Sequence, residues 1–365
     1  MKQWKIGAAV RCVAIVGLLA GTIWAQESSA ERAARRRKAM EERAMRELAE
    51  ADPAMGDWSG AWELDDGGDY GTCVAQVIAL GAGKYRINLM ERFDTRMPAI
   101  ASLEGAARDG AVVFTGPGNY DGRALRLEVK IVDGELKGTF DATEATGKLE
   151  MERVVRLSPT LGARAPDDAV VLFNGRDMSP WRHPGKPDGQ DGCQWALVGR
   201  AMEVKPGSGS IISRPMFGDV RLHVEFRTPF MPQARGQGRG NSGVYLQGRY
   251  EVQVLDSYGL EGADNECGGL YQVAKPLVNM CAPPTQWQTY DITFRAPVFD
   301  DQGNRKEPAR MTVIHNGVRI HDNIALPGAT TAALGGDPRQ LAGVYLQDHG
   351  NKVQFRNIWA VELKD

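Results

Sequence analysis

The chain has 365 residues, of which 42% are hydrophobic and 25% are charged. These are the values of a soluble globular protein with room for two domains. Its formal net charge of −2 gives no electrostatic basis for binding nucleic acid, so we expect no such partner. With 43 Gly and 19 Pro, the composition favours many short strands joined by turns over a helical bundle.

Residues 1–25 have the pattern of a secretory signal peptide. Lys2, Lys5 and Arg11 precede an apolar run that ends at Ala25, and this order of basic and apolar residues is typical of an export leader. The run is shorter than the ~20 apolar residues that a membrane span needs. We therefore expect an exported protein, periplasmic or secreted, with no stable membrane span once the leader is removed. An uncleaved membrane anchor is the alternative.

Residues 26–54 are rich in Ala, Glu and Arg. These are strong helix formers, but the segment has no wide apolar stripe that could be buried against a core. The pattern predicts a charged, solvated helical linker that acts as a tether between the leader and the first domain.

Residues 55–158 are predicted to form a smaller antiparallel β domain. Short strand-like runs such as "KYRINLM" and "ALRLEVKIV" alternate with the turn signals "GAG", "RDG", "NYDG" and "VDG". Successive strands joined by tight turns make a meander or a small barrel. We find no convergent catalytic set here, so a binding or spacer role is expected.

After a linker with the Pro, Gly and polar content of a loop, a second β domain is expected over residues 169–365. About twelve strand-like runs follow one another, among them "VRLHVEFRT", "YEVQVLD" and "AGVYLQDHG". No long run of helical period interrupts them. The pattern predicts an all-β fold with two packed antiparallel sheets, a sandwich of the jelly-roll type.

This second domain resembles a known family over about residues 169–365. The matching stretches are "LFNGRDMSPW" at 172–181, "GSIISRPMFGDVRLHVEFR" at 209–227, "GNSGVYLQGRYEVQVLDS" at 240–257, "WQTYDITFRAP" at 287–297, "VIHNGVRIHDN" at 313–323 and "GVYLQDHGNKVQFRNIWAVEL" at 343–363. Together they resemble the 3-keto-disaccharide hydrolase domain family, whose fold is the concanavalin A-like lectin/glucanase sandwich.

The resemblance implies an enzyme that cleaves glycosides whose sugar carries a ketone at carbon 3. An upstream sugar 3-oxidoreductase would supply that substrate. A C3 ketone acidifies the C2 proton, so the bond can break by elimination followed by hydration as well as by direct hydrolysis. A non-catalytic, lectin-like carbohydrate-binding protein of the same fold is the alternative. An ordinary glucanase fits less well, because Glu251 is followed by Gln253 instead of a second carboxylate.

Alternation of apolar and polar residues defines one polar face on each of three strand-like runs. The polar faces carry Arg221, His223, Glu225 and Arg227 on the first run, Glu251 and Gln253 on the second, and Tyr345, Gln347 and His349 on the third. Amides, carboxylates and aromatic rings suit sugar hydroxyl groups and ring faces. We therefore predict that the three faces form one sugar-binding floor; the alternative for each residue is a solvated strand face.

The predicted catalytic residues are His349, Glu251 and Glu225. His349 is the first candidate for a proton-transfer group, because His titrates near neutral pH. Glu251 would act as a base or would orient a His, and Glu225 is third, with an ion pair to a neighbouring Arg as its alternative. The predicted substrate-binding residues are Asn241, Ser242, Gln253, Asp256, Gln347, Tyr345, His223 and Arg227.

No cofactor is assigned from the sequence. A divalent cation held by Glu225, Glu251 and His349 is an open alternative that no spacing rule supports. A structural zinc site is not expected, because no C-x-x-C or H-x-x-x-H spacing occurs.

Cys267 and Cys281 could close one loop by a disulfide, or they could be two separate buried thiols. Three histidines stand apart from the predicted floor. His315 and His321 flank a hairpin turn and are expected at the surface. His183 lies in a Pro- and Gly-rich loop that could form part of the groove rim.

Overall fold

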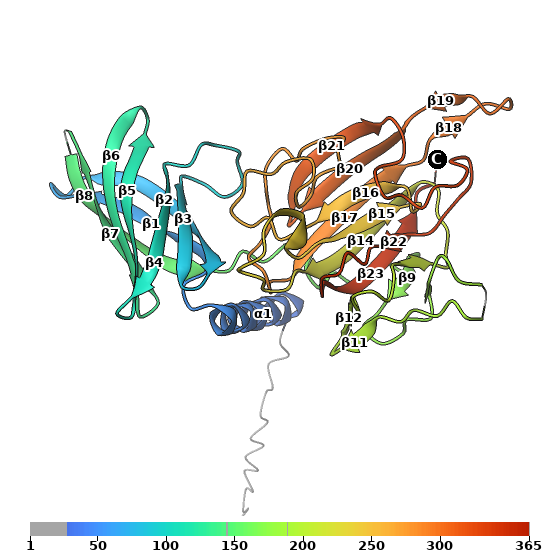
Figure 1. Cartoon of the computed structure of the whole chain (residues 1–365), viewed down its shortest axis with the longest axis horizontal. Coiled ribbons are helices and arrows are strands. Elements are labelled where there is room, and N and C mark those ends of the chain that lie inside the picture. The colour runs from blue at the N-terminus through green and yellow to red at the C-terminus, as the bar shows by residue number, and fades with distance from the viewer. Residues whose placement is uncertain (1–27, 144, 188, 365) are drawn as a thin grey trace, which may run out of the picture. The chain divides into compact units, whose positions relative to one another are not determined.

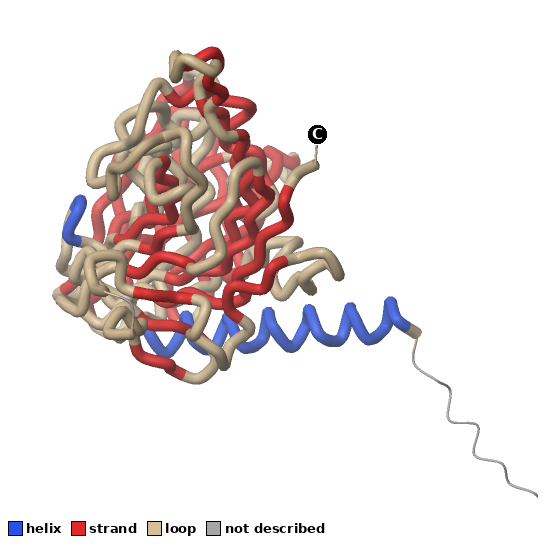
Figure 2. Tube along the Cα trace, turned by 90° about the vertical axis from the view of Figure 1, so that its right-hand side faces the viewer, coloured by secondary structure: helices blue, strands red, loops and turns tan. Residues whose placement is uncertain are grey.

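The computed structural model describes residues 28–143, 145–187 and 189–364. The predicted signal peptide lies outside the described residues. Figure 2 shows a chain of strands and loops with one long helix. The prediction of an all-β protein with a helical segment near its N-terminus is confirmed. Among the described residues, no helix is long and apolar enough to cross a bilayer.

Helix α1 spans Ser29–Ala51. It begins with a capping box, in which the Ser28 hydroxyl accepts the Glu31 N–H and the Glu31 carboxylate accepts the Ser28 N–H. The boundary between the two units of the chain falls within this helix, between Met40 and Glu41.

Eight consecutive strands close into an antiparallel barrel (Figure 1). The first strand pairs with both the second and the eighth, which closes the ring. Every second side chain of "RALRLEVKIV" is buried from Leu125 to Ile131, as the alternation requires. The strands are β1 Gly56–Leu64, β2 Asp69–Gly81, β3 Lys84–Met90, β4 Ala101–Arg108, β5 Ala111–Tyr120, β6 Arg123–Val132, β7 Glu135–Ala142 and β8 Ala145–Val154.

The C-terminal half forms two main sheets. The five-stranded sheet has the order β10-β13-β22-β15-β16, and the eight-stranded sheet has the order β11-β12-β23-β14-β17-β20-β21, with β9 beside β23. A small hairpin, β18–β19, stands apart. A short 3-10 helix, η1, spans Gly236–Gly238. The strands are β9 Val170–Phe173, β10 Trp181–Arg182, β11 Ala196–Val198, β12 Ala201–Glu203, β13 Ile211–Ser213, β14 Val220–Arg227, β15 Ser242–Leu246, β16 Tyr250–Val254, β17 Gln288–Arg295, β18 Val298–Phe299, β19 Arg305–Glu307, β20 Ala309–His315, β21 Val318–Leu326, β22 Tyr345–Leu346 and β23 Gln354–Glu362.

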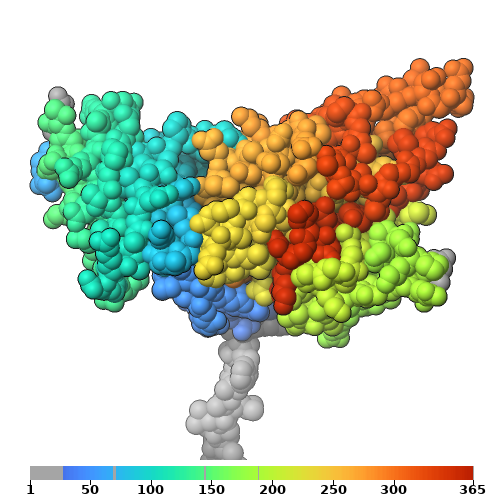
Figure 3. Space-filling model, in the orientation of Figure 1, coloured from blue at the N-terminus to red at the C-terminus, as the bar shows by residue number. Residues whose placement is uncertain are grey.

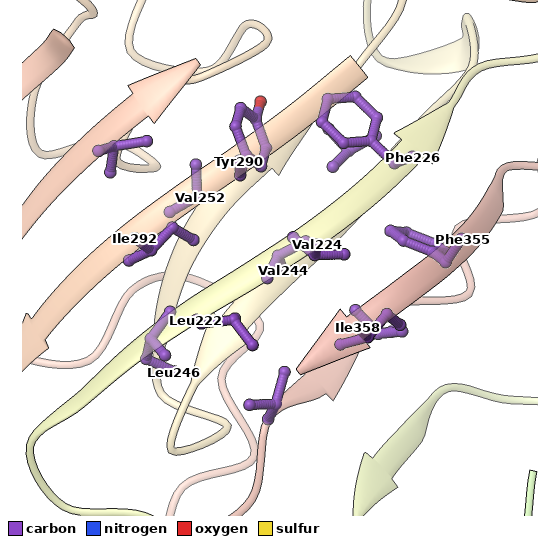
Figure 4. Close-up of a cluster of buried hydrophobic side chains, with 14 of the residues drawn as sticks. Leu222, Val224, Phe226, Val244, Leu246, Val252, Tyr290, Ile292, Phe355 and Ile358 are labelled. Atoms are coloured by element: carbon purple, nitrogen blue, oxygen red, sulfur yellow. The ribbon is translucent and has the colours of Figure 1, made fainter. Parts of the chain in front are cut away.

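One hydrophobic core lies between these two sheets (Figure 4). Leu222, Val224 and Phe226 of β14 and Val244 and Val252 of the smaller sheet belong to the same buried cluster. The inward faces predicted by alternation are therefore confirmed. Burial of these branched and aromatic side chains stabilises each sheet against the other, at about 25 cal/mol per Å² of apolar surface. The polar faces of the two sheets consequently point away from each other.

The prediction that His315 and His321 are surface residues is wrong. Both side chains are buried. The Nε2 atom of His315 lies 3.0 Å from the Gln288 amide oxygen, and that of His321 lies 2.7 Å from the Gly268 carbonyl oxygen. Burial lowers the pKa of His315 to about 3, so it is neutral in the folded protein. The sequence around the two histidines predicts only a hairpin turn. The segment that follows β16 folds back over this hairpin and buries both side chains.

Candidate active site

The outer face of the five-stranded sheet carries the candidate site. Strand register aligns Glu251 of β16 with Tyr245 of β15, and Tyr245 with Tyr345 of β22. Ile212 of β13 pairs with Tyr345 and completes this row. Tyr245, Tyr345 and Ile212 form a small cluster separate from the main core. We call this outer face, with Glu251 and Gln253 at its β16 side, the floor.

The Glu251 carboxylate lies over the backbone of β15. A Cβ atom on Gly243 would collide with Oε1 of Glu251, so only glycine leaves this space. Glu251 is buried, and burial raises the pKa of its carboxyl to about 8, against an opposing hydrogen bond from Tyr245. Within the described part of the chain, no cationic side chain offsets the effect of burial. A carboxyl that titrates near neutral pH can accept or donate a proton during turnover.

A hydrogen-bond chain fixes this carboxylate. The side-chain amide of Gln347 donates to the Tyr245 hydroxyl at 3.1 Å, and the hydroxyl in turn bonds to Glu251. The Tyr345 ring meets the Tyr245 ring edge-on, with 5.0 Å between centroids. Since each member is held by the next, the position of Glu251 is set before any ligand enters.

A second row of the floor consists of amides. The Gln237 side-chain oxygen accepts from Nδ2 of Asn241 and from Nε2 of Gln253, at 3.0 Å in both cases. Nε2 of Gln237 donates to the Asn265 carbonyl at 2.7 Å. These contacts fix both amide orientations, and they leave Oδ1 of Asn241 and Oε1 of Gln253 without partners among the described residues. A buried acceptor without a partner favours a ligand that brings a hydroxyl group to donate to it.

His349 lies exposed after the end of β22, two residues beyond Gln347. Its neighbour Asp348 accepts the Gly209 N–H at 3.0 Å. His183 lies against the same Gly209, where a Cβ would collide with its Nε2. His183 therefore lies beside the residues that lead into β13, and the chain reaches His349 one residue after Asp348; the rim position of His183 stays a prediction.

The prediction that His223, Glu225 and Arg227 share this floor is wrong. They lie on β14, which belongs to the eight-stranded sheet. Their side chains lie on the outer face of that sheet, away from the five-stranded sheet and its floor. Alternation defines the polar face of a strand but does not say to which sheet the strand belongs.

Those three side chains are held by structural contacts. His223 lies 2.7 Å from a carboxylate oxygen of Asp291 and stacks on Trp359. Glu225 accepts from the Gly162 N–H at 2.5 Å and from Nε of Arg356 at 2.6 Å. Burial alone would raise the pKa of Glu225, but the bonds from His223, Arg356 and Asn357 hold it below its ordinary value.

Arg227 has its own partners on that sheet. It donates to the Gln354 side-chain oxygen at 2.6 Å, pairs with Glu47 at 3.3 Å, and lies over the ring of Trp287. Trp287 is half-buried. Arg227 therefore leaves the predicted substrate-binding set.

Two other predicted substrate contacts are used internally. The Ser242 hydroxyl donates to the Gln347 carbonyl at 2.6 Å and shares the inward register of Val254. Asp256 forms a buried ion pair with Arg239 at 2.6 Å. Because these groups are already paired, Ser242 and Asp256 support the floor but do not face it.

The divalent-cation set of Glu225, Glu251 and His349 does not converge, since Glu225 belongs to the other sheet. Over residues 28–364, leaving out the two undescribed positions, no group of three His, Cys, Asp or Glu side chains could hold a metal ion. Cys267 and Cys281 are free, buried thiols, as in the second of the two alternatives.

Sequence reasoning missed Tyr245, Gly243 and Gln237. Tyr245 was detectable, because alternation within "SGVYLQG" places it opposite the apolar face of Val244. Gly243 and Gln237 gave no signal, since their importance depends on side chains that arrive from β16.

Residues 168–361 match the model of the 3-keto-alpha-glucoside-1,2-lyase-like domain family. This range contains all the residues of the floor. No curated protein matches the chain.

Several crystal structures are similar to parts of the chain. A candidate glycosyl hydrolase from Parabacteroides distasonis is 36% identical and covers 55% of this chain and 85% of its own, with a TM-score of 0.48. A second from the same organism is 18% identical and covers 54% of this chain and 95% of its own, with a TM-score of 0.39. Fatty-acid-binding protein 1 of Echinococcus granulosus is 17% identical and covers 29% of this chain and 99% of its own, with a TM-score of 0.20.

Proposed function

Since the chain belongs to the 3-keto-alpha-glucoside-1,2-lyase-like domain family, we propose that it is an exported carbohydrate-active enzyme that cleaves the glycosidic bond of 3-keto-glycosides. Family membership supports the glycoside-cleaving activity. The 3-keto substrate, the reaction route, the export and a concanavalin A-like jelly-roll fold for the sandwich are parts of the proposal. An upstream sugar 3-oxidoreductase supplies the ketone.

The observation that carries the proposal is the buried carboxyl of Glu251, which is held by the Tyr245 hydroxyl and, among the described residues, is not offset by a cationic side chain. A ketone at C3 acidifies the proton on C2, and a base with a pKa of about 8 is suited to remove it near neutral pH. The electron pair from the C2–H bond forms an enolate with the C3 carbonyl. Collapse of that enolate makes the C1–C2 double bond and expels the glycosidic oxygen, which takes up a proton.

Water then adds to C1, and a proton returns to C2, so the net reaction is hydrolysis. In this proposal Glu251 removes the C2 proton and Tyr245 holds its carboxylate in place. His349 donates the proton to the leaving oxygen. The sugar hydroxyl groups bind to the amide side chains of Asn241, Gln253 and Gln347, and the Tyr345 ring lies beside the sugar.

The test is to incubate the mature protein with a 3-keto-glucoside and with its unoxidised parent. Release of the aglycone from the keto form alone supports the proposal. Solvent deuterium at C2 of the product indicates elimination and hydration, and its complete absence contradicts that route. Saturable binding without release from either compound would leave the lectin-like alternative.

A further inference from the structure

Strand β16 ends the five-stranded sheet, and residues 268–271, the first part of the segment 268–274, lie along its free edge. Gln253 exchanges two backbone hydrogen bonds with this segment, at 2.9 and 3.0 Å. The Tyr271 N–H donates to the Glu251 carbonyl at 3.3 Å. This segment therefore fixes the backbone of both floor residues of β16. It belongs to the connection between β16 and β17, residues 255–287, which we call the covering loop.

The covering loop is bound to the barrel by Arg96, which lies between β3 and β4. Nη2 of Arg96 donates to the carbonyls of Gly262 and Pro276 at 2.8 and 2.9 Å. Nε donates to the Leu277 carbonyl at 3.2 Å. One guanidinium thus joins two stretches of the loop that are fourteen or more positions apart, which suits its fixed fork of donors.

Two more contacts bind the start of the covering loop to barrel strands. Nδ2 of Asn88 on β3 donates to the Gly259 carbonyl at 2.8 Å. The Tyr258 hydroxyl donates to the Asp57 carboxylate of β1 at 2.8 Å, and this group is buried. Gly259 has φ +75°, and a Cβ there would collide with the Ile78 side chain, so the backbone of Gly259 packs directly against that side chain of β2.

The loop before β15 also contacts the barrel. Nη2 of Arg235 donates to the Leu80 carbonyl at 2.8 Å. Arg235 stands two residues before Gln237, whose side chain orients the amides of Asn241 and Gln253. In Figure 3 the yellow and orange atoms of the second domain border the cyan atoms of the barrel.

We infer that the barrel is part of the active-site scaffold, and that Arg96 and Asn88 are positioning residues for the covering loop. Residues 41–365 form one compact unit, so these contacts lie within a single body. A long loop without regular structure opens easily unless other elements hold it. By holding the covering loop, the barrel keeps the backbone of Glu251 and Gln253 in register before substrate binds.

Of the results expected below, only the change in turnover rests on the proposed function. In the double variant Arg96→Ala/Asn88→Ala, the amides of residues 268–274 should exchange hydrogen faster than in the wild type, by at least ~10-fold. The unfolding temperature should stay close to that of the wild type. Turnover of the 3-keto-glucoside should fall by at least ~10-fold through kcat, because a displaced base loses reactivity more than binding.

The matched control is Arg86→Ala, which removes an ion pair to Glu104 within the barrel at 3.1 Å. This control should leave exchange and kinetics unchanged. Compared with Arg96→Ala, the variant Arg96→Lys should retain part of the protection from hydrogen exchange and part of kcat. Lys keeps the positive charge but lacks the fixed fork of donors that reaches both stretches of the loop.

Unchanged exchange at residues 268–274 in the double variant would overturn the inference. Faster exchange spread evenly over both sheets would also overturn it, because that pattern signals general destabilisation. If the wild type does not turn over 3-keto-glycosides, the proposed function fails, and the exchange measurement still decides whether the barrel holds the loop.

Discussion

The two sheets of the sandwich each carry a buried glutamate on a strand that alternates apolar and polar residues, and the surroundings of the two carboxylates are opposite. Glu225 accepts hydrogen bonds from Gly162, Arg356 and Asn357, and its pKa is held below the ordinary value. Glu251 has no cationic partner in the part of the chain that the structure describes, and its pKa is raised to about 8.

The comparison shows which buried carboxylate is free to do chemistry. A buried carboxylate that accepts hydrogen bonds at both oxygens, one of them from an arginine, is stabilised in its charged form and resists protonation. A carboxyl whose pKa is raised by burial, and which is held by a single hydroxyl, can change its protonation state near neutral pH and is therefore a candidate for proton transfer. The residue type and the alternation are the same in both cases, so neither of them marks the site.

The largest expected difference is in turnover. Glu251→Gln should lower kcat by ~10²–10⁴-fold, because the amide keeps the shape but cannot take up a proton. Glu225→Gln should leave kcat close to that of the wild type in protein that has folded. Steady-state rates on the 3-keto-glucoside measure both, and wild-type turnover by Glu251→Gln would remove Glu251 from the mechanism.

The free energy of unfolding should fall more when Glu225 is replaced than when Glu251 is replaced. Glu225→Ala should lower the free energy of unfolding by about 1–3 kcal/mol, because it removes the acceptor of the Gly162 N–H and of the Asn357 amide. It also removes the carboxylate that pairs with half-buried Arg356. Glu251→Gln should not destabilise the protein at pH 8, since it replaces a carboxyl that resists ionisation. Urea unfolding measures both variants. Equal losses would mean that the two carboxylates are equally paired.

The pH dependence of stability should differ in sign between the two glutamates. The folded pKa of Glu251 is about 8 against 4.5 in the unfolded chain, so the folded state binds the extra proton and loses stability as pH rises from about 4.5 to 8. Glu251→Gln should remove this loss. Glu225 has a lowered folded pKa, so its contribution is present above the unfolded pKa of 4.5 and is lost as pH falls through the folded pKa.

The smallest expected effect concerns Tyr245. As a base, Glu251 should give a kcat/KM that rises with pH through a midpoint of about 8. Tyr245→Phe removes the hydrogen bond that opposes the effect of burial, and should move this midpoint upward by about one pH unit. Tyr345→Phe is the control, because its ring stays in place. A downward shift in Tyr245→Phe would contradict the assigned bond.

Much of the fold was predictable because it depends on short-range patterns. The helix, the strands of the barrel and the inward faces of "VRLHVEFRT", "YEVQVLD" and "AGVYLQDHG" follow from local propensity and from a period of two. The floor residues Glu251, Gln253, Tyr345 and Gln347 were predicted for the same reason.

The assignment of strands to sheets was not predictable in this way. His223 faces Asp291, which is 68 positions away, and the Gly162 N–H reaches Glu225 from 63 positions away. His315 and His321 follow a hairpin pattern that is typical of the surface, yet they are buried. Long-range pairing depends on which chain segments meet, and a local pattern does not contain that information.

The sequence by itself determined that this protein has an all-β sandwich of the 3-keto-alpha-glucoside-1,2-lyase-like family, and that Glu251 lies on a polar strand face. Only the tertiary structure decided that Glu225 and His223 are bonded to side chains within their own sheet, and that Glu251 is a buried carboxyl with no counter-charge among the described residues. The physical reason is that a carboxylate takes its pKa from its neighbours in space, and here they come from strands and loops distant in the chain.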